Sequence, residues 1–346
     1  MLNLLTALGL WMCCISTRFE PASWPRFSLL GLTFPIFLVL DLCFIAAWLV
    51  VRWRWAWIPL ATIIPCLSYV LDYYPVSFRS KVPEGSIKVV TWNTNGYGAH
   101  CEDKEEARIL TCEYLKNSGA DIICMQESSI WGVVIEGFSN YMDSVGYQSD
   151  RHGGTVIFSK FPILDSDTLH YDTHRTNGVS GNTSKWYKLL MGKDTILLVN
   201  NHLESNHLEP AVKEKYVEQL DKPEIDQIKE SGHTIGSLLV RSVAFRGQQA
   251  DSLVALTERF KGMPIIMCGD FNDTPISYAY QRVNKVMKSA FRESGNGIGI
   301  SYNQRGFWVR IDHIFTSEHW QTYNTSIDNS ILTSDHYPLV SWLKLK

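Results

Sequence analysis

The chain has 346 residues, a formal net charge of −3 and a hydrophobic content of 45%, enough for two or more domains. Residues 1–83 hold six of the 32 basic and three of the 35 acidic residues, so the remaining 26 basic and 32 acidic residues give a net charge of −6. This balance argues against a general duplex-DNA binder, which usually has a basic excess, although a basic groove on an acidic body stays open.

The first 75 residues contain the long apolar stretches. Residues 28–51 carry one charge, Asp41, and are long enough to span a bilayer, whereas residues 2–17 and 55–71 are uncharged and of marginal length. We therefore predict a membrane anchor over residues 1–78 with about three transmembrane helices. A cleaved signal peptide is the alternative for residues 2–17, but no basic segment precedes this stretch and no clear cleavage site follows it.

The orientation of the anchor depends on the charges beside each predicted span. Arg52 and Arg54 lie in the short loop between the second and third spans, which favours a cytoplasmic loop and an external C-terminal part. Basic residues at the other ends oppose this assignment, namely Arg18, Arg26, Arg79 and Lys81. We expect residence in the membrane, with the catalytic part on the external or periplasmic side.

Residues 79–84 form the predicted linker, and residues 85–346 form the predicted catalytic domain. Within it, helices are expected at 102–118, 209–230, 234–261 and 278–289, and strands at 121–125 and 155–159. Strands and helices alternate irregularly and the strands fall in two groups, which fits two packed sheets with helices outside. The eight cysteines show no zinc-type spacing, and only Cys101 and Cys112 are candidates for pairing, which we do not expect.

Six polar clusters, most of them following a compact apolar run, are the most informative feature of the catalytic part. Such runs are typical of buried strands, and strand ends in one sheet bring distant polar residues to a common edge. Asn, Asp, Glu and His at that edge are suited to a hard metal ion and a phosphate. The clusters cover residues 92–95, 126–127, 201–204, 269–272, 310–313 and 334–336, and read WNTN, QE, NHLE, GDFN, RIDH and SDH.

The residues of these clusters and their order along the chain resemble the motifs of the endonuclease/exonuclease/phosphatase family, which has the deoxyribonuclease-I-like fold. The resemblance covers about residues 84 to 346 and points to a bacterial, membrane-anchored type. It implies an α/β fold, a four-layer α/β/β/α sandwich of two mixed sheets flanked by helices, with the site at one end.

The same resemblance implies a divalent metal site. Glu127 corresponds to the main carboxylate ligand of the metal. Asp335 binds the metal or contacts one of its ligands. Asn95 stands where many members of the family have Asp. An amide oxygen still ligates a metal or orients its water, but it contributes no charge. The expected ion is Mg²⁺, for which Mn²⁺ can substitute. The alternative for the Asn residues is turn chemistry at strand ends.

The catalytic residues implied by the resemblance come from the later clusters. Asp270 aligns and deprotonates the attacking water, and Asn272 holds a phosphoryl oxygen or the nucleophile. His336 contacts the scissile phosphate, while Asp312 fixes its tautomer as carboxylates do for working imidazoles. His202 donates to a non-bridging oxygen as charge builds up.

Three further residues are weaker candidates. Asn93 is expected to bind the phosphate or the carboxylates of the site. Arg246 is a candidate substrate contact from its long helix, with a plain helix-surface position as the alternative. Glu204 supports the metal or His202, or forms a salt bridge.

The sequence thus predicts a Mg²⁺-dependent phosphoesterase, a phosphodiesterase or phosphatase, in which water attacks a phosphate ester in line. No Ser or Cys nucleophile motif is present, so no covalent intermediate is expected. The substrate classes left open are a lipid headgroup, a nucleotide and nucleic acid, and no protein partner is predicted. The alternatives are a membrane-tethered nuclease and a non-catalytic binding module.

Overall fold

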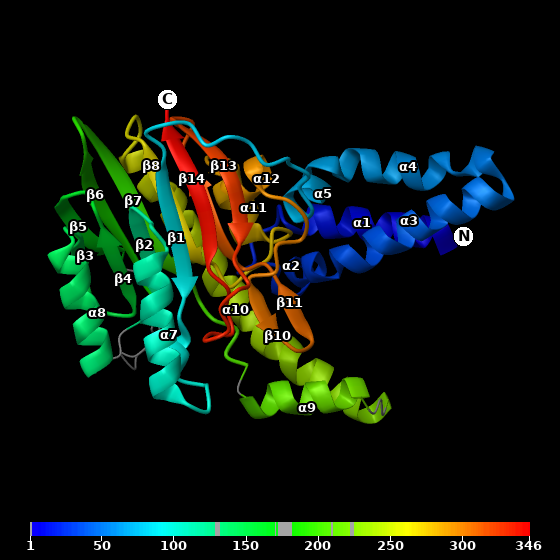
Figure 1. Ribbon diagram of the computed structural model, residues 1–346. Coiled ribbons are helices and arrows are strands. Elements are labelled where there is room, and N and C mark those ends of the chain that lie inside the picture. Colours follow the sequence, from blue (N-terminus) through cyan, green and yellow to red (C-terminus); the bar gives the residue numbers. More distant parts are fainter. Residues whose placement is uncertain (1, 129–131, 170, 172–181, 209, 222–224) are drawn as a thin grey trace.

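The computed structural model describes residues 2–128, 132–169, 171, 182–208, 210–221 and 225–346 (Figure 1). Two six-stranded sheets pack against each other in the catalytic part, and helices lie on their outer faces. This arrangement confirms the predicted layered α/β sandwich.

The two sheets are both mixed. The first has the order β13-β14-β1-β2-β4-β3, made of β13 (Trp320–Ile327), β14 (Leu339–Leu345), β1 (Ile87–Asn93), β2 (Ile122–Gln126), β4 (Thr155–Ser159) and β3 (Gln148–Asp150). The second has the order β5-β6-β7-β8-β12-β9, made of β5 (Ile163–Leu169), β6 (Ser184–Met191), β7 (Asp194–His202), β8 (Ile265–Asp270), β12 (Asp312–Thr316) and β9 (Lys288–Ser289). A separate hairpin pairs β10 (Tyr302–Gln304) with β11 (Phe307–Val309).

The core follows from the alternation of side chains along buried strands. In β1, Val89 points into the layer between the sheets, where it packs with Ile122 and Ile266. Its neighbours Val90 and Trp92 point to the opposite face. Because both faces of the central strands are covered, these segments read as continuous apolar runs rather than alternating ones.

The outer layers are helical. The helices α6 (Asn95–Gly98), α7 (Lys104–Asn117) and α8 (Val133–Ser144) belong to the first half, and α9 (Pro210–Asp221), α10 (Ile225–Arg259), α11 (Tyr278–Asn284) and α12 (Ala290–Ser294) to the second. The Asp103 carboxylate starts α7 by accepting from the backbone N–H groups of Glu105 and Glu106. Leu115 of α7 packs on the first sheet, and Leu253 of α10 packs on the second.

Two helix predictions were wrong in their boundaries. Residues 278–289 were expected to form one helix, but α11 ends at Asn284 and Lys288–Ser289 pair with β12 instead. Ser289 is extended there because its hydroxyl caps α12 by accepting from the Arg292 N–H. The predicted break near residue 230 is wrong, because α10 runs without interruption from Ile225 to Arg259.

Residues 2–73 form a helical arm that projects away from the sheets (Figure 1). It contains α1 (Leu2–Ser16), α2 (Pro25–Ser28), η1 (Leu29–Thr33), α3 (Phe34–Val51), η2 (Trp53–Trp55), α4 (Trp57–Ile63), η3 (Ile64–Cys66) and α5 (Leu67–Tyr73).

Two helical runs of the arm, Pro25–Val51 and Trp53–Tyr73, are long and apolar enough to cross a membrane by length and composition. The first helix, Leu2–Ser16, is also apolar but only 15 residues long. At 1.5 Å per residue it falls short of a hydrocarbon core of about 30 Å, so length and composition identify two of the three predicted spans. The anchor of three spans stays a prediction. Large apolar side chains are exposed along the arm, among them Leu4, Ile36, Val50 and Ile64.

The arm docks on the catalytic part through polar and apolar contacts. Asp72 at the end of α5 is buried, lies 2.7 Å from Arg292 Nη1 and accepts from Gln281. Arg310, also buried, donates to the backbone carbonyls of Asp72 and Tyr73. The arm is therefore held by side chains of α11, α12 and the segment before β12. The structure places no disulfide among the cysteines, in line with expectation for Cys101 and Cys112.

Candidate active site

The polar clusters meet at one edge of the two sheets because their strands run side by side. Strand β1 is parallel to β2, which sets Asn93 opposite Gln126, and β7 is parallel to β8, which sets His202 opposite Asp270. Across the sheets, the Asn93 amide donates to Glu127 Oε1 at 3.0 Å and to Asp270 Oδ2 at 3.1 Å. One amide thus joins the two carboxylates, one from each sheet.

Three residues at the strand ends have left-handed backbone conformations, with φ of 44° at Asn95, 53° at Glu127 and 52° at Asn272. Such angles are uncommon outside glycine and cost energy unless the surroundings compensate. Part of the compensation is visible, since the Asn95 N–H donates to Asn93 Oδ1 and the Asn272 N–H to Asp270 Oδ1. The chain therefore turns sharply after β1, β2 and β8 and leaves these side chains at the edge.

Gly269 has a steric role just before Asp270. Its φ is +130°, and a Cβ added there would lie 2.0 Å from the carbonyl oxygen of Asn201. Only glycine allows β8 and β7 to approach this closely. The close approach sets the position of Asp270 relative to His202.

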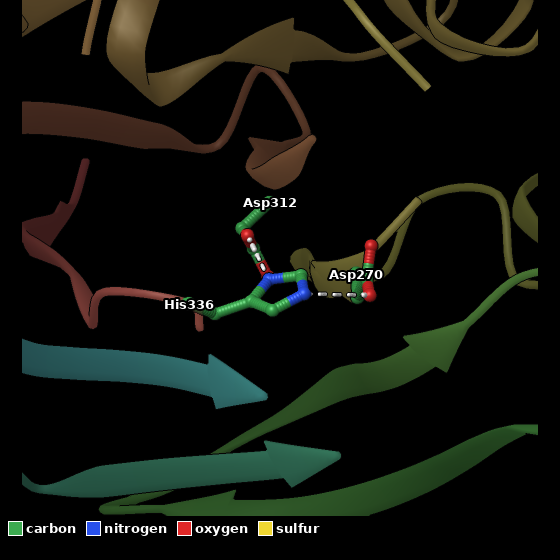
Figure 2. A group of neighbouring side chains, drawn as sticks. All are labelled: Asp270, Asp312 and His336. Carbon is green, nitrogen blue, oxygen red and sulfur yellow. Dashed lines mark hydrogen bonds and ion pairs between the residues drawn. The ribbon is translucent and has the colours of Figure 1, made fainter. Parts of the chain in front are cut away.

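His336 lies between two carboxylates, as Figure 2 shows. Its Nδ1 is 2.8 Å from Asp312 Oδ2, and its Nε2 is 3.8 Å from Asp270 Oδ2. All three side chains are buried. The short contact to Asp312 holds the imidazole with Nδ1 as a donor and aims Nε2 at Asp270.

The electrostatics of this group follow from its burial. Burial raises the pKa of Asp270 to about 6, against the opposing charges of His336 and His202. Burial alone would lower the pKa of His336, but the carboxylates of Asp312 and Asp270 outweigh it and raise that pKa to about 10. Near neutral pH the site therefore holds an ionised, weakly acidic Asp270 beside an imidazolium.

His202 approaches the same carboxylates from β7. Its Nε2 lies 3.6 Å from Glu127 Oε1 and 3.8 Å from Asp270 Oδ2. His202, at the end of β7, and His336, in the segment between β13 and β14, thus face Asp270 from different parts of the chain. Two imidazoles placed in this way are suited to stabilise negative charge on a phosphoryl group.

Two sets of side chains have the donor chemistry for a metal ion. Glu127 is 41% exposed to the cleft, and beside it the Asn95 amide donates to Asp335 Oδ1 at 2.8 Å. These oxygen donors, partly open to solvent, suit Mg²⁺, which binds few carboxylates and keeps several waters. The ligand atoms of Asp270, Asp312 and His336 also lie within 4.8 Å of one another. There the Asp312–His336 hydrogen bond already uses Nδ1, so the Glu127 set is the better fit.

Asn272 and Arg246 are placed differently from each other. The Asn272 amide donates to the Leu203 carbonyl at 3.1 Å and to Asp270 Oδ2 at 3.3 Å, so it lies within the site. Arg246 is only 2% exposed, so the surface alternative was wrong. Its Nε lies 3.1 Å from Asp273 Oδ2, and its Nη1 donates to the Glu204 carbonyl. Arg246 lines the cleft, but these contacts make it a support for the loops on either side.

Glu204 does not contact His202 or the expected metal ligands through its described hydrogen bonds. Its carboxylate accepts from Asn182 at 2.8 Å and lies 2.8 Å from His207 Nε2. The contact with His207 matches the salt-bridge reading of the sequence when that imidazole is protonated.

Sequence reasoning missed Tyr302 and Lys213. The ring of Tyr302 lies 4.9 Å from the ring of His336, and the Lys213 Nζ donates to the Tyr302 hydroxyl at 2.6 Å. Both residues line the cleft. Neither belongs to a polar cluster after an apolar run, so no sequence signal distinguished them from surface residues of a helix and a hairpin.

A layered sandwich with carboxylates, amides and two histidines gathered at one sheet edge defines a class of proteins that hydrolyse phosphate esters. Residues 90–336 match the family model described as Endonuclease/Exonuclease/phosphatase family, and the chain belongs to that family. This result confirms the resemblance seen in the sequence. Residues 1–73 match a second model, described as Domain of unknown function (DUF8431). A comparison with curated protein sequences found no significant match.

Solved structures agree on the fold. An endonuclease/exonuclease/phosphatase from Bacteroides vulgatus is 18% identical, with 76% of this chain and 100% of that chain covered and a TM-score of 0.54. The human Nocturnin catalytic domain is 18% identical over 78% of this chain and 96% of that chain, with a TM-score of 0.54. Truncated TDP2 from Caenorhabditis elegans is 17% identical over 76% and 99%, with a TM-score of 0.50. At these identities the similarity establishes the fold.

Proposed function

We propose that this protein is a Mg²⁺-dependent phosphoesterase that is tethered to a membrane by its N-terminal helices. The observation that carries the proposal is the convergence of Glu127, Asp270 and His336 on one cleft, with Asn93 hydrogen bonded to both carboxylates. Family membership supports the chemistry, because proteins of this family generally hydrolyse phosphate esters.

Glu127 would hold the divalent ion, with Asn95 and Asp335 oriented beside it. When bound, the ion supplies charge neutralisation and polarises a phosphoryl oxygen. The left-handed backbone at Glu127 and Asn95 fixes the direction of these side chains before any substrate arrives. Such preorganisation avoids a reorganisation cost during the reaction.

Asp270 is placed to orient and deprotonate the attacking water. A general base works best when its pKa lies near the working pH, and burial raises that of Asp270 to about 6. The Asn93 and Asn272 amides donate to its Oδ2 and so fix the carboxylate. His202 and His336, each within 4 Å of the same oxygen, would donate to the phosphoryl group as charge develops.

The membrane tether is supported by the two apolar helical runs and by the exposed apolar side chains of the arm. Soluble monomers rarely expose contiguous apolar surfaces of this kind. The external or periplasmic side remains our proposal for the catalytic domain, on the charges of Arg52 and Arg54 in the loop between the two runs.

Hydrolysis by the full-length protein in detergent would test the proposal. Bis-p-nitrophenyl phosphate and p-nitrophenyl phosphate should be compared, because they separate diester from monoester chemistry. We expect turnover of at least one, loss on chelation, and recovery with Mg²⁺ or Mn²⁺. Turnover that survives exhaustive chelation would contradict the metal-dependent mechanism, and a folded protein inactive on both esters would favour the binding-module alternative.

A further inference from the structure

The cleft that contains the candidate site continues well beyond it. Its volume is about 660 Å³, within the range of about 300–1,000 Å³ that is usual for ligand pockets. Glu127, Asp270 and His336 of the candidate site line one part of it. A second part, formed by η1, α10 and β11 and here called the outer end, contributes Leu29, Leu32, Leu239, Val243, Phe307 and Trp308 to the lining.

One wall of the outer end comes from the membrane arm rather than from the catalytic domain. Leu29 and Leu32 belong to η1, which packs directly on the catalytic part. A Cβ at Gly31 would lie 1.8 Å from the Ile276 carbonyl oxygen, so glycine is required for this close approach. The other walls come from α10 and the β10–β11 hairpin. The wall is therefore a fixed part of the cleft.

The position of this wall relates the cleft to the bilayer. η1 belongs to the apolar helical run Pro25–Val51, near the end that meets the catalytic part. Leu32 and Trp308 are both more than one-third exposed at the cleft, at 41% and 56%. An apolar opening beside the end of a membrane span lies where the acyl chains of the bilayer begin.

The charges along the cleft disfavour a polyanion. Among its described lining residues are the carboxylates of Glu127, Asp270, Asp273 and Asp335, against three cations, Lys213, Arg246 and the His336 imidazolium, which is paired with Asp312. Arg246 is paired with Asp273, and Lys213 donates to Tyr302. A groove for nucleic acid needs basic side chains along the backbone path, which this lining does not supply.

We infer that the substrate is a membrane phospholipid whose phosphate binds at Asp270 and His336 and whose hydrocarbon chain lies in the outer cleft between η1, α10 and the β10–β11 hairpin. This inference rests on the proposed phosphoesterase function and adds the substrate class to it. The arm then has two roles, because it anchors the protein and completes the part of the cleft that binds the chain.

Matched esters that differ only in chain length test the inference on the full-length protein in detergent. The pairs are methyl and octyl p-nitrophenyl phosphate for diester chemistry, and methyl and octyl phosphate for monoester chemistry, each below its critical micelle concentration. We expect KM to fall at least about tenfold from methyl to octyl, since each buried methylene adds apolar contact. Leu32→Gln should remove most of this difference by raising KM for the octyl ester.

Trp308→Ser serves as a second variant, because its exposed side chain is not needed for folding, and it should act in the same direction. Leu164→Gln on β5, equally apolar and 54% exposed but outside the cleft, is the matched control. Equal KM values for the two chain lengths, or faster hydrolysis of a single-stranded oligonucleotide than of either ester, would overturn the inference alone. Absence of hydrolysis of all these esters would instead overturn the proposed function.

Discussion

Asp312 and His336 form a buried hydrogen bond of 2.8 Å between Oδ2 and Nδ1, and this contact fixes the direction in which the second imidazole nitrogen points. Asp312→Asn would place an amide where the carboxylate accepts that proton and would remove the main charge that keeps His336 protonated. We expect kcat to fall about 100-fold or more, the range for a misplaced acid–base group. The measurement is steady-state hydrolysis of the better p-nitrophenyl ester.

Asp165→Asn on β5 is the matched control for that variant, since Asp165 is exposed and pairs only with Lys188 in its described contacts. Its rate should equal that of the unmodified protein. An Asp312→Asn enzyme with near-normal kcat would show that the imidazole needs no carboxylate partner.

Activity should depend on pH through Asp270. The base acts when ionised, so kcat/KM should be constant above the raised pKa of about 6 and fall about tenfold per unit below it. A bound cation favours the ionised carboxylate, so the acidic limb should move to lower pH as Mg²⁺ is increased. A rate that stays constant down to pH 4.5, at the lowest Mg²⁺ concentration that supports turnover, would argue against Asp270 as the base.

Gly269→Ala should disrupt the site and the fold together. The new Cβ would meet the Asn201 carbonyl oxygen at 2.0 Å in a left-handed conformation, which we expect to cost roughly 2 kcal/mol or more of unfolding free energy. Gly137→Ala in α8 is the control, because a Cβ there meets nothing within 4 Å and alanine favours helix. The measurement is thermal unfolding of both variants. A Gly269→Ala protein with the same melting temperature as the Gly137→Ala protein would contradict the steric role of Gly269.

The docking of the arm should depend on the pair between Asp72 and Arg292. Arg292→Ala leaves a buried carboxylate without its cation, and such losses cost about 3–5 kcal/mol for fully buried pairs. Because Arg292 is itself 27% exposed, we expect the lower end of that range. Arg305→Ala, which breaks an exposed pair with Asp221, should cost less than about 1 kcal/mol. Limited proteolysis at residues 74–86 in detergent would report the docking, and equal cleavage of both variants would contradict it.

Folding stability should decline in mild acid because of His313. Burial, then the nearby Arg310 charge, lowers the pKa of His313 to about 3 in the folded protein. The unfolded chain binds a proton near pH 6.5, so this contribution is complete above 6.5 and is lost as the pH falls toward 3. His313→Gln should reduce the drop in melting temperature between pH 7.5 and 5.5, and an unchanged drop would assign the effect to other groups.

The sandwich was predicted from the family resemblance, whereas the polar edge was predicted from local patterns in the sequence. Apolar runs such as Ile122 to Met125 identify central strands, and the polar residue after each run must lie at a strand end. The pairing of β1 with β2 and of β7 with β8 then brings those ends together, and the family order of the clusters substituted for that long-range information.

What sequence reasoning missed depends on contacts between distant segments. The burial of Arg246 follows from Asp273 and the Glu204 loop folding over it, and nothing within α10 indicates this. The contact of Tyr302 with His336 likewise depends on a short hairpin whose position is set by tertiary packing. One wall of the cleft is η1, and the other walls belong to the catalytic domain. The sequence analysis had assigned these segments to separate parts of the chain.

At the left-handed residues Asn95, Glu127 and Asn272, thermal stability and catalytic activity make opposite demands. Glycine would relieve the backbone at each position and raise the melting temperature, but it would also delete the functional side chain. Laboratory selection for thermal stability alone would therefore favour glycine at these three positions. The most stable variants would be those that no longer turn over substrate.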